Sequence, residues 1–176
     1  KKKKTRTPPK YAITRVKDKR VKEYFAMMVE NEGYRPKVYR DTKGKPTVGV
    51  GLNLAEPMNQ QFLKEEGIDL KEVLAGKPLS DNQIKRLYNR SLTQAFKDAQ
   101  EYDPGFARRP EPVKKALVDM SFNLGLTKLK KFEKMKEGLD ANDYAKVARE
   151  MVDSNWYKDV KSRGPRTVGL VESIIK

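Results

Sequence analysis

Two carboxylates nine residues apart, Glu32 and Asp41, are the side chains of this sequence best placed for acid–base chemistry. The chain of 176 residues has no histidine and no cysteine, which excludes histidine bases, thiolate nucleophiles and thiolate metal sites. Proton transfer then falls to carboxylates, or less often to Lys or Tyr. Glu32 ends an apolar helical stripe that includes Phe25 and Met28, where partial desolvation favours a protonated carboxyl able to donate to a leaving oxygen. A solvated helix end is the alternative interpretation.

Asp41 begins a run of turn-forming residues, 41–44, between two segments of strand-like composition. Aspartate is a preferred turn residue, so a purely structural role also explains its position. The functional interpretation requires an ionised carboxylate that faces Glu32 across a gap. The end of a helix beside the tip of a two-stranded sheet supplies such a gap.

The strand expected after the turn, over residues 47–52, has an unusual face. Alternation places Thr47, Gly49 and Gly51 on one side, so this side carries a single hydroxyl and almost no other side-chain atoms. Glycine in a strand is typical of places where a ligand or another backbone approaches closely, and a sugar ring fits this description. A β-bulge or tight packing beneath a helix is the alternative.

The helices and strands that must position these residues are predicted from the hydrophobic periodicity of the sequence and from its capping and turn-forming residues. A helix from Lys19 ends at Gly33, strands cover 34–41 and 47–52, and a short helix lies near Met58–Glu66. The rest reads as helices: one behind the capping box 80–83, one from Pro112 to Gly125, one short helix over 129–135, one capped by Asn142 and one from Ser162.

This order predicts an α+β, mostly helical protein with two lobes and a cleft between them. Residues 19–79 form the lobe with the small antiparallel sheet, and residues 80–176 form the larger helical lobe. Residues 1–18 have no hydrophobic period and read as a basic arm or linker.

The net charge of +15 comes from 39 basic and 24 acidic residues and is concentrated at the start of the chain. Residues 1–22 hold eleven Lys/Arg and one acid, Asp18. Such an arm can bind nucleic acid, an anionic wall polymer or a membrane surface, or serve as a solvated linker. Beyond the arm the excess charge is too small for a phosphate-binding footprint, so no specific nucleic acid is expected. No apolar run approaches the ~18 residues that a membrane span needs.

Three separated groups of residues resemble the phage-type lysozymes, glycoside hydrolase family 24. The first comprises Glu32-Gly33, Tyr39-Arg40-Asp41-Thr42, Gly44 and residues 47–51; the second is 116–125; the third is 154–157 with 163–166. Their common order over roughly residue 19 to the end makes the resemblance specific. Two departures are Leu52, where many members have histidine, and the basic arm.

The resemblance implies a lysozyme-like fold and hydrolysis of the β-1,4 bond between N-acetylmuramic acid and N-acetylglucosamine in peptidoglycan. It implies Glu32 as the general acid, Asp41 as base or charge stabiliser on the opposite side of the sugar, and Thr47 as the residue that holds the attacking water. The implied outcome is inversion at the anomeric carbon. No metal and no cofactor are implied.

Further residues enter through the same resemblance. Substrate-binding positions would be Gly49, Gly51, Asn53, Phe122 and Asn123. Arg163 matches a basic position close to the catalytic glutamate, where a cation would lower the pKa of Glu32 and oppose the effect of desolvation.

The implied setting is a monomeric domain of a phage virion or infected-cell cytoplasm that acts on the bacterial wall, in entry or in lysis. An alternative is a lysozyme-like module of a larger virion protein, whose basic arm binds nucleic acid or other virion parts. The chain does not begin with Met, as expected for such a piece. An inactive relative with the same fold is the other alternative, against which the three catalytic-type residues argue.

Overall fold

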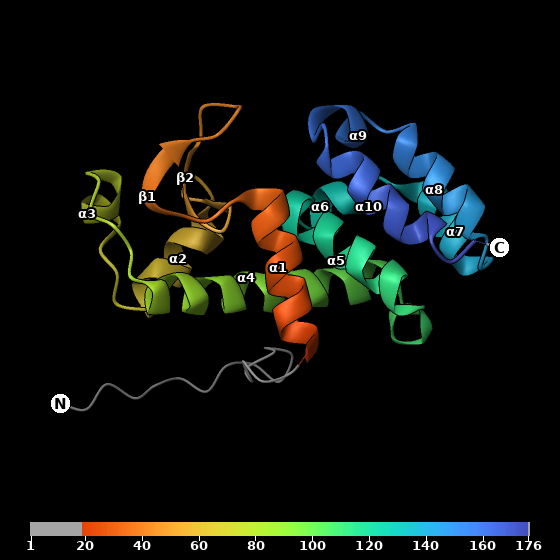
Figure 1. The fold of residues 1–176 in the computed structure, drawn as a ribbon, viewed down its shortest axis with the longest axis horizontal. Helices are drawn as coiled ribbons and strands as arrows, with labels where there is room; N and C mark the ends of the chain where they lie inside the picture. The colour runs from red at the N-terminus through yellow and green to blue at the C-terminus, as the bar shows by residue number, and fades with distance from the viewer. Residues whose placement is uncertain (1–18, 176) are drawn as a thin grey trace. The chain divides into compact units, whose positions relative to one another are not determined.

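The computed structural model describes residues 19–175, which form two compact units (Figure 1). The division falls between Thr93 and Gln94, inside α4 (Asp81–Tyr102), whereas the sequence analysis placed it between residues 79 and 80, just before this helix. The basic arm predicted for residues 1–18 lies outside the described residues.

The first unit contains a helix, a small sheet, two short helices and the first part of a long helix. In chain order these are α1 (Lys19–Glu32), β1 (Arg35–Arg40), β2 (Pro46–Gly49), β3 (Leu52–Asn53), α2 (Pro57–Glu65), α3 (Leu70–Leu74) and the beginning of α4.

The second unit is helical throughout its described residues. It holds the end of α4, the 3-10 helix η1 (Phe106–Arg108), α5 (Glu111–Leu124), α6 (Leu126–Leu129), α7 (Glu133–Asp140), α8 (Tyr144–Val152), α9 (Asn155–Asp159) and α10 (Arg163–Glu172). Together with the sheet of the first unit, these helices confirm the predicted α+β class, mostly helical. No helix in residues 19–175 is both long and apolar enough to cross a membrane.

The sheet is antiparallel with the strand order β1-β2-β3, and Tyr39 pairs with Thr47, which in turn pairs with Asn53. The single second strand predicted over 47–52 is wrong. The strand β2 ends at Gly49, the chain turns through residues 50–51, and β3 returns alongside. Both Gly49 and Gly51 have positive φ, 65° and 63°, a conformation that side-chain-bearing residues rarely adopt.

Helix α1 packs into the first unit through the apolar stripe seen in the sequence. Tyr24 and Met28 are buried, and the ring of Phe25 contacts the rings of Tyr34 and Tyr88 edge-on at 6.4 and 5.0 Å between centroids. The helix ends at Glu32, immediately before Gly33, as predicted. This packing fixes the end of α1, and therefore Glu32, within the first unit.

The capping box predicted before α4 is confirmed. Ser80 Oγ accepts a hydrogen bond from the backbone N–H of Gln83 at 3.1 Å, and Gln83 Oε1 accepts one from the backbone N–H of Ser80 at 2.9 Å. The exchange satisfies two backbone donors and sets the register in which Ile84 and Leu87 face the core.

Two local predictions in the second unit are corrected. The short helix expected over 129–135 is instead two helices, α6 and α7, with Phe132 at the N-cap of the second. The cap of α8 is Asp143, whose carboxylate accepts from the backbone N–H of Lys146 at 3.0 Å, while Asn142 precedes it with a φ of 52°. Asparagine tolerates this left-handed conformation, which brings the chain around into the helix.

Candidate active site

Glu32 lies against the backbone of the turn between β2 and β3. A Cβ atom added to Gly51 would lie 2.5 Å from Oε2 of Glu32 and 2.7 Å from its Cδ, distances so short that the glutamate or the turn would have to shift. The partly buried carboxyl of Glu32 therefore occupies the space that a side chain at position 51 would fill. Gly51 serves two needs, a positive φ for the turn and close approach of the glutamate.

Asp41 is held by the backbone of the turn between β1 and β2. Its Oδ1 accepts hydrogen bonds from the N–H groups of Lys43 at 2.9 Å and Lys45 at 2.8 Å. The backbone N–H of Asp41 donates to the carbonyl of Lys45 at 2.9 Å, which closes the turn. These bonds fix the direction of the carboxylate and leave Oδ2 outside them.

Thr47 is buried in β2, and its hydroxyl donates to the carbonyl oxygen of Lys45 at 3.1 Å. The backbone of Lys45 therefore bridges two predicted site residues, donating through its N–H to Asp41 and accepting through its carbonyl from Thr47. Since the hydroxyl proton of Thr47 is engaged in this bond, its oxygen lone pairs are left to accept hydrogen bonds from another group.

Tyr39 is a site residue that the sequence analysis quoted in a motif but assigned no role. Burial raises the pKa of Tyr39, the negative charges of Glu32 and Asp41 raise it further, and the cation of Arg35 acts in the opposite direction. The guanidinium of Arg35 lies 4.3 Å from the centre of the Tyr39 ring. The tyrosine therefore lies within electrostatic reach of both predicted catalytic carboxylates.

One sequence signal could have identified Tyr39. It stands two residues before Asp41, so strand alternation predicts the same face for both. The structure adds that Tyr39 lies directly opposite Thr47 in the β1–β2 pair, and cross-strand partners share a face. Asn53 completes this row on the third strand; its Oδ1 accepts from the N–H of Ala55 at 2.9 Å, which begins the turn toward α2.

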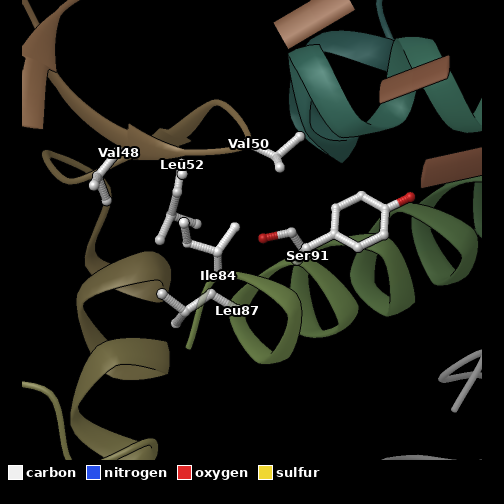
Figure 2. Close-up of a pocket in the computed structure, with 8 residues that line it drawn as sticks. Val48, Val50, Leu52, Ile84, Leu87 and Ser91 are labelled. Carbon is white, nitrogen blue, oxygen red and sulfur yellow. The ribbon is translucent and has the colours of Figure 1, made fainter. Parts of the chain in front are cut away.

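Gly49 does not share the surroundings of Gly51. A Cβ on Gly49 would lie 3.5 Å from Cγ2 of Ile84, on α4. Beside it is a cavity of about 10 Å³, lined mainly by apolar residues of the sheet and of α4, with room for about one water molecule. In Figure 2, Leu52 from the sheet and Ile84 from α4 point toward each other across this space. Because the turn interrupts the strand, alternation no longer places the two glycines on one face.

The remaining predicted residues belong to the second unit. Phe122 is half-buried and Asn123 is exposed, both near the end of α5. Arg163, the first residue of α10, is buried and forms a two-pronged pair with the fully buried Asp119, with Nη2 2.6 Å from Oδ1 and Nε 3.1 Å from Oδ2. The hydroxyl of Thr167 donates to Oδ2 of Asp119 at 2.7 Å. The roles of these residues toward substrate or Glu32 stay predictions.

Within residues 19–175, no group of three or more acidic side chains is arranged so that it could hold a metal ion.

An α+β chain whose first helix ends in a glutamate beside a small sheet, with an aspartate in the hairpin turn, has the features of a lysozyme-like glycosidase. The sequence model of the phage lysozyme family matches residues 29–173, and the chain belongs to this family of enzymes.

Three curated relatives are similar to this chain. The pre-baseplate central spike protein Gp5 of Enterobacteria phage T4 is 28% identical over 153 residues, which cover 82% of this chain but only 27% of Gp5. Probable T4-type lysozymes 1 and 2 of Dictyostelium discoideum are 24% and 22% identical, and in each case 84% of this chain matches 92% of the relative. The chain therefore spans about a quarter of Gp5 and nearly the whole of the other two.

Proposed function

We propose that this enzyme hydrolyses the β-1,4 bond between N-acetylmuramic acid and N-acetylglucosamine in bacterial peptidoglycan, with Glu32 as general acid and Asp41 and Thr47 directing water. The observation that carries this proposal is the packing of the Glu32 carboxyl on Gly51, together with the influence of both Glu32 and Asp41 on Tyr39. Two carboxylates near a common side chain supply the pair of carboxyl groups that glycoside hydrolysis requires.

In the proposed reaction, Glu32 gives its proton to the glycosidic oxygen as the bond from that oxygen to the anomeric carbon breaks. The oxygen of a water molecule bonds to the anomeric carbon from the opposite face, and the proton that it loses passes to Asp41. The net change is the addition of one water across the bond, and both carboxyl groups return to their starting states by exchange with solvent.

The hydrogen bonds of the hairpin support the roles proposed for Asp41 and Thr47. The hydroxyl of Thr47 donates its proton to the carbonyl oxygen of Lys45, so it can only accept a hydrogen bond from water. A water molecule that donates to Thr47 directs a lone pair away from the threonine. Asp41 keeps Oδ2 outside the backbone bonds that orient it. The shared backbone of Lys45 fixes the two groups on one rigid turn, which is the positioning that a directed water attack requires.

The test of this function is digestion of purified peptidoglycan, with the new reducing ends identified by mass spectrometry. We expect N-acetylmuramic acid at every new reducing end. N-acetylglucosamine at the new ends, or the release of peptides without new reducing ends, would reject the proposed bond.

The stereochemistry gives an independent prediction. Inverting enzymes hold their two carboxyl groups roughly 6.5–9.5 Å apart to leave room for water, whereas retaining enzymes hold them about 5–5.5 Å apart. We expect inversion, so proton NMR of a fresh digest should show the α-anomer first. If the β-anomer forms first, Asp41 acts as a nucleophile and the water-directing role of Thr47 is wrong.

Substitution of Gly51 tests the geometry of the site. We expect Gly51→Ala to lower the rate of peptidoglycan hydrolysis about 10²-fold, because the new Cβ displaces the Glu32 carboxyl and displacements of about 1 Å have effects of this size. The strain of alanine at positive φ should also lower the free energy of unfolding by about 1–2 kcal/mol. Initial rates and urea unfolding curves measure the two effects.

Gly76→Ala is the matched control, because Gly76 has a φ of 103° and an added Cβ there meets nothing within 4 Å. The Gly76→Ala variant should have a lower free energy of unfolding, because of the same backbone strain, and an unchanged rate of peptidoglycan hydrolysis. Equal activity of the two variants would mean that Glu32 need not lie against Gly51.

A second candidate function is that of a lysozyme module within a larger phage particle protein, which is compatible with the first. Its support is the similarity to Gp5, a central spike protein of which this chain spans 27%. Mass spectrometry of the native protein, separated before digestion, distinguishes the two settings: peptides from this chain should migrate at the mass of the longer protein. Migration near the mass of the 176-residue chain, away from particles, favours a free lytic enzyme.

A further inference from the structure

The junction between α1 and β1 is attached to the start of α4. Tyr34, two residues after Glu32, donates its hydroxyl proton to Oδ1 of Asp81, the first residue of α4. Two residues further along β1, the carbonyl oxygen of Pro36 accepts a hydrogen bond from the backbone N–H of Leu79 at 2.9 Å. A side-chain bond and a backbone bond therefore hold the beginning of β1 at the same end of α4.

The bond between Tyr34 and Asp81 joins a phenol to a carboxylate. Hydrogen bonds to an ionised acceptor are about twice as strong as those between neutral groups. Asp81 lies in the first turn of α4, where the helix dipole favours a negative charge. Burial, the hydrogen bond to Asp81 and the charge of Asp81 raise the pKa of Tyr34 to about 12. At neutral pH the phenol therefore stays protonated and remains a donor.

The ring of Tyr34 makes a separate connection. It contacts the ring of Phe25 in α1 edge-on, with 6.4 Å between centroids, and Phe25 in turn contacts Tyr88 of α4 at 5.0 Å. These contacts link α1, the junction and α4 within the first unit. They do not involve the hydroxyl of Tyr34, so the phenol bond can be removed while the rings stay in place.

Glu32 lies between two of these contacts. Phe25 precedes it by about two helical turns. The Cα of Tyr34 is at most about 7.6 Å from the Cα of Glu32, because successive Cα atoms are 3.8 Å apart. The carboxyl of Glu32 packs so closely on Gly51 that an added Cβ would lie 2.5 Å from Oε2. A movement of the junction therefore changes where this carboxyl lies relative to Gly51.

We propose that Tyr34 is a positioning residue for the hydrolysis: its hydrogen bond to Asp81 holds the α1–β1 junction so that the Glu32 carboxyl can reach the leaving oxygen. This inference rests on the proposed function and adds to it a residue that acts through Glu32. Misplacement of a catalytic group by about 1 Å can lower a rate by about 10²-fold. Because the ring contacts and the bond between Pro36 and Leu79 remain, loss of the phenol bond should lower the rate about tenfold.

The experiment compares substitutions at both ends of this bond. Tyr34→Phe removes only the hydroxyl and keeps the ring against Phe25. Asp81→Ala removes the acceptor, whereas Asp81→Asn keeps an Oδ1 that can accept from the phenol. Tyr102→Phe is the matched control, because it removes a phenol that donates to the carbonyl oxygen of Phe132 at 2.5 Å in the second unit. Soluble peptidoglycan strands serve as substrate for kcat and KM, and urea unfolding is measured for every variant.

We expect Tyr34→Phe and Asp81→Ala each to lower kcat about tenfold with KM unchanged, because Glu32 acts in the bond-breaking step. The double variant should be no slower than the slower single variant, since both changes remove one interaction. Asp81→Asn should recover most of the rate. Tyr102→Phe should lower the urea midpoint and keep its kcat. An unchanged kcat in Tyr34→Phe overturns the proposal, and so does an Asp81→Asn variant as slow as Asp81→Ala.

A second readout does not depend on hydrolysis. The negative charge of Glu32 raises the pKa of Tyr39, so displacement of the Glu32 carboxyl in Tyr34→Phe should shift the Tyr39 pKa. Tyr102→Phe should leave it unchanged. NMR titration of labelled tyrosine rings measures the shift, and an unmoved Tyr39 in Tyr34→Phe overturns the proposal. If Glu32→Gln keeps its activity while Tyr34→Phe shifts the Tyr39 titration, the proposed role of Glu32 in hydrolysis fails, but its positioning by Tyr34 is supported.

Discussion

We expect Glu32→Gln to lower the rate of peptidoglycan hydrolysis by about 10²–10⁴-fold, the usual contribution of a general acid. Glutamine keeps the size and planar shape of the side chain, so it fits the same space against Gly51. What it lacks is a proton that can be transferred to the leaving oxygen. Initial rates measured by new reducing ends give the loss, and circular dichroism should be unchanged.

Glu56→Gln is the matched control for this substitution. Glu56 is exposed at the N-cap of α2, and its side chain makes no capping hydrogen bond. Its variant should keep full activity, which excludes a general effect of removing one negative charge from the first unit. Retention of more than a tenth of the activity by Glu32→Gln would remove Glu32 from the role of general acid.

The same variant offers a readout that does not depend on activity. The negative charge of Glu32 raises the pKa of Tyr39, so the neutral glutamine should let the Tyr39 pKa fall toward its ordinary value. Asp41 and burial still act on the tyrosine, so the fall should be partial. NMR titration of labelled tyrosine rings measures the change, and an unmoved Tyr39 titration would contradict the closeness of the two residues.

The largest effect on stability is expected at Asp119. We expect Asp119→Leu to lower the free energy of unfolding by about 3–5 kcal/mol, because it takes the two-pronged carboxylate partner from the buried guanidinium of Arg163. Thr167 loses an acceptor as well. Urea unfolding can be followed by the fluorescence of Trp156, which is the only tryptophan in the sequence and is buried in the same unit.

Two further variants isolate the cause. Asp140→Leu removes an exposed carboxylate that pairs with Lys136 at 3.1 Å, and its effect should stay below about 1 kcal/mol. Asp119→Leu/Arg163→Met removes both charges of the buried pair, and much of the lost stability should return because the buried guanidinium that lost its Asp119 partner is gone as well. A loss of less than about 1 kcal/mol for Asp119→Leu alone would show that Arg163 does not depend on this pair.

Features that depend on neighbouring residues were predictable from the sequence. The apolar stripe of α1 and its end before Gly33 gave the position of Glu32, and the reciprocal bonds of Ser80 and Gln83 gave the start of α4. Turn chemistry placed Asp41 at the tip of a hairpin, where its Oδ1 accepts from two backbone N–H groups. These signals are local, because a cap, a turn or a helix face is decided within a few residues.

Contacts between distant residues were decided only by the tertiary structure. Alternation predicted that Gly49 and Gly51 share a face, but that rule holds only while a strand continues, and the positive φ of both glycines turns the chain instead. Gly49 then meets Ile84, and Gly51 meets Glu32, which lies at the end of a different element. The pairing of Asp119 with Arg163, 44 residues later, has no local signal either. The residues next to Asp119 in the sequence do not indicate which distant cation will pair with its buried carboxylate.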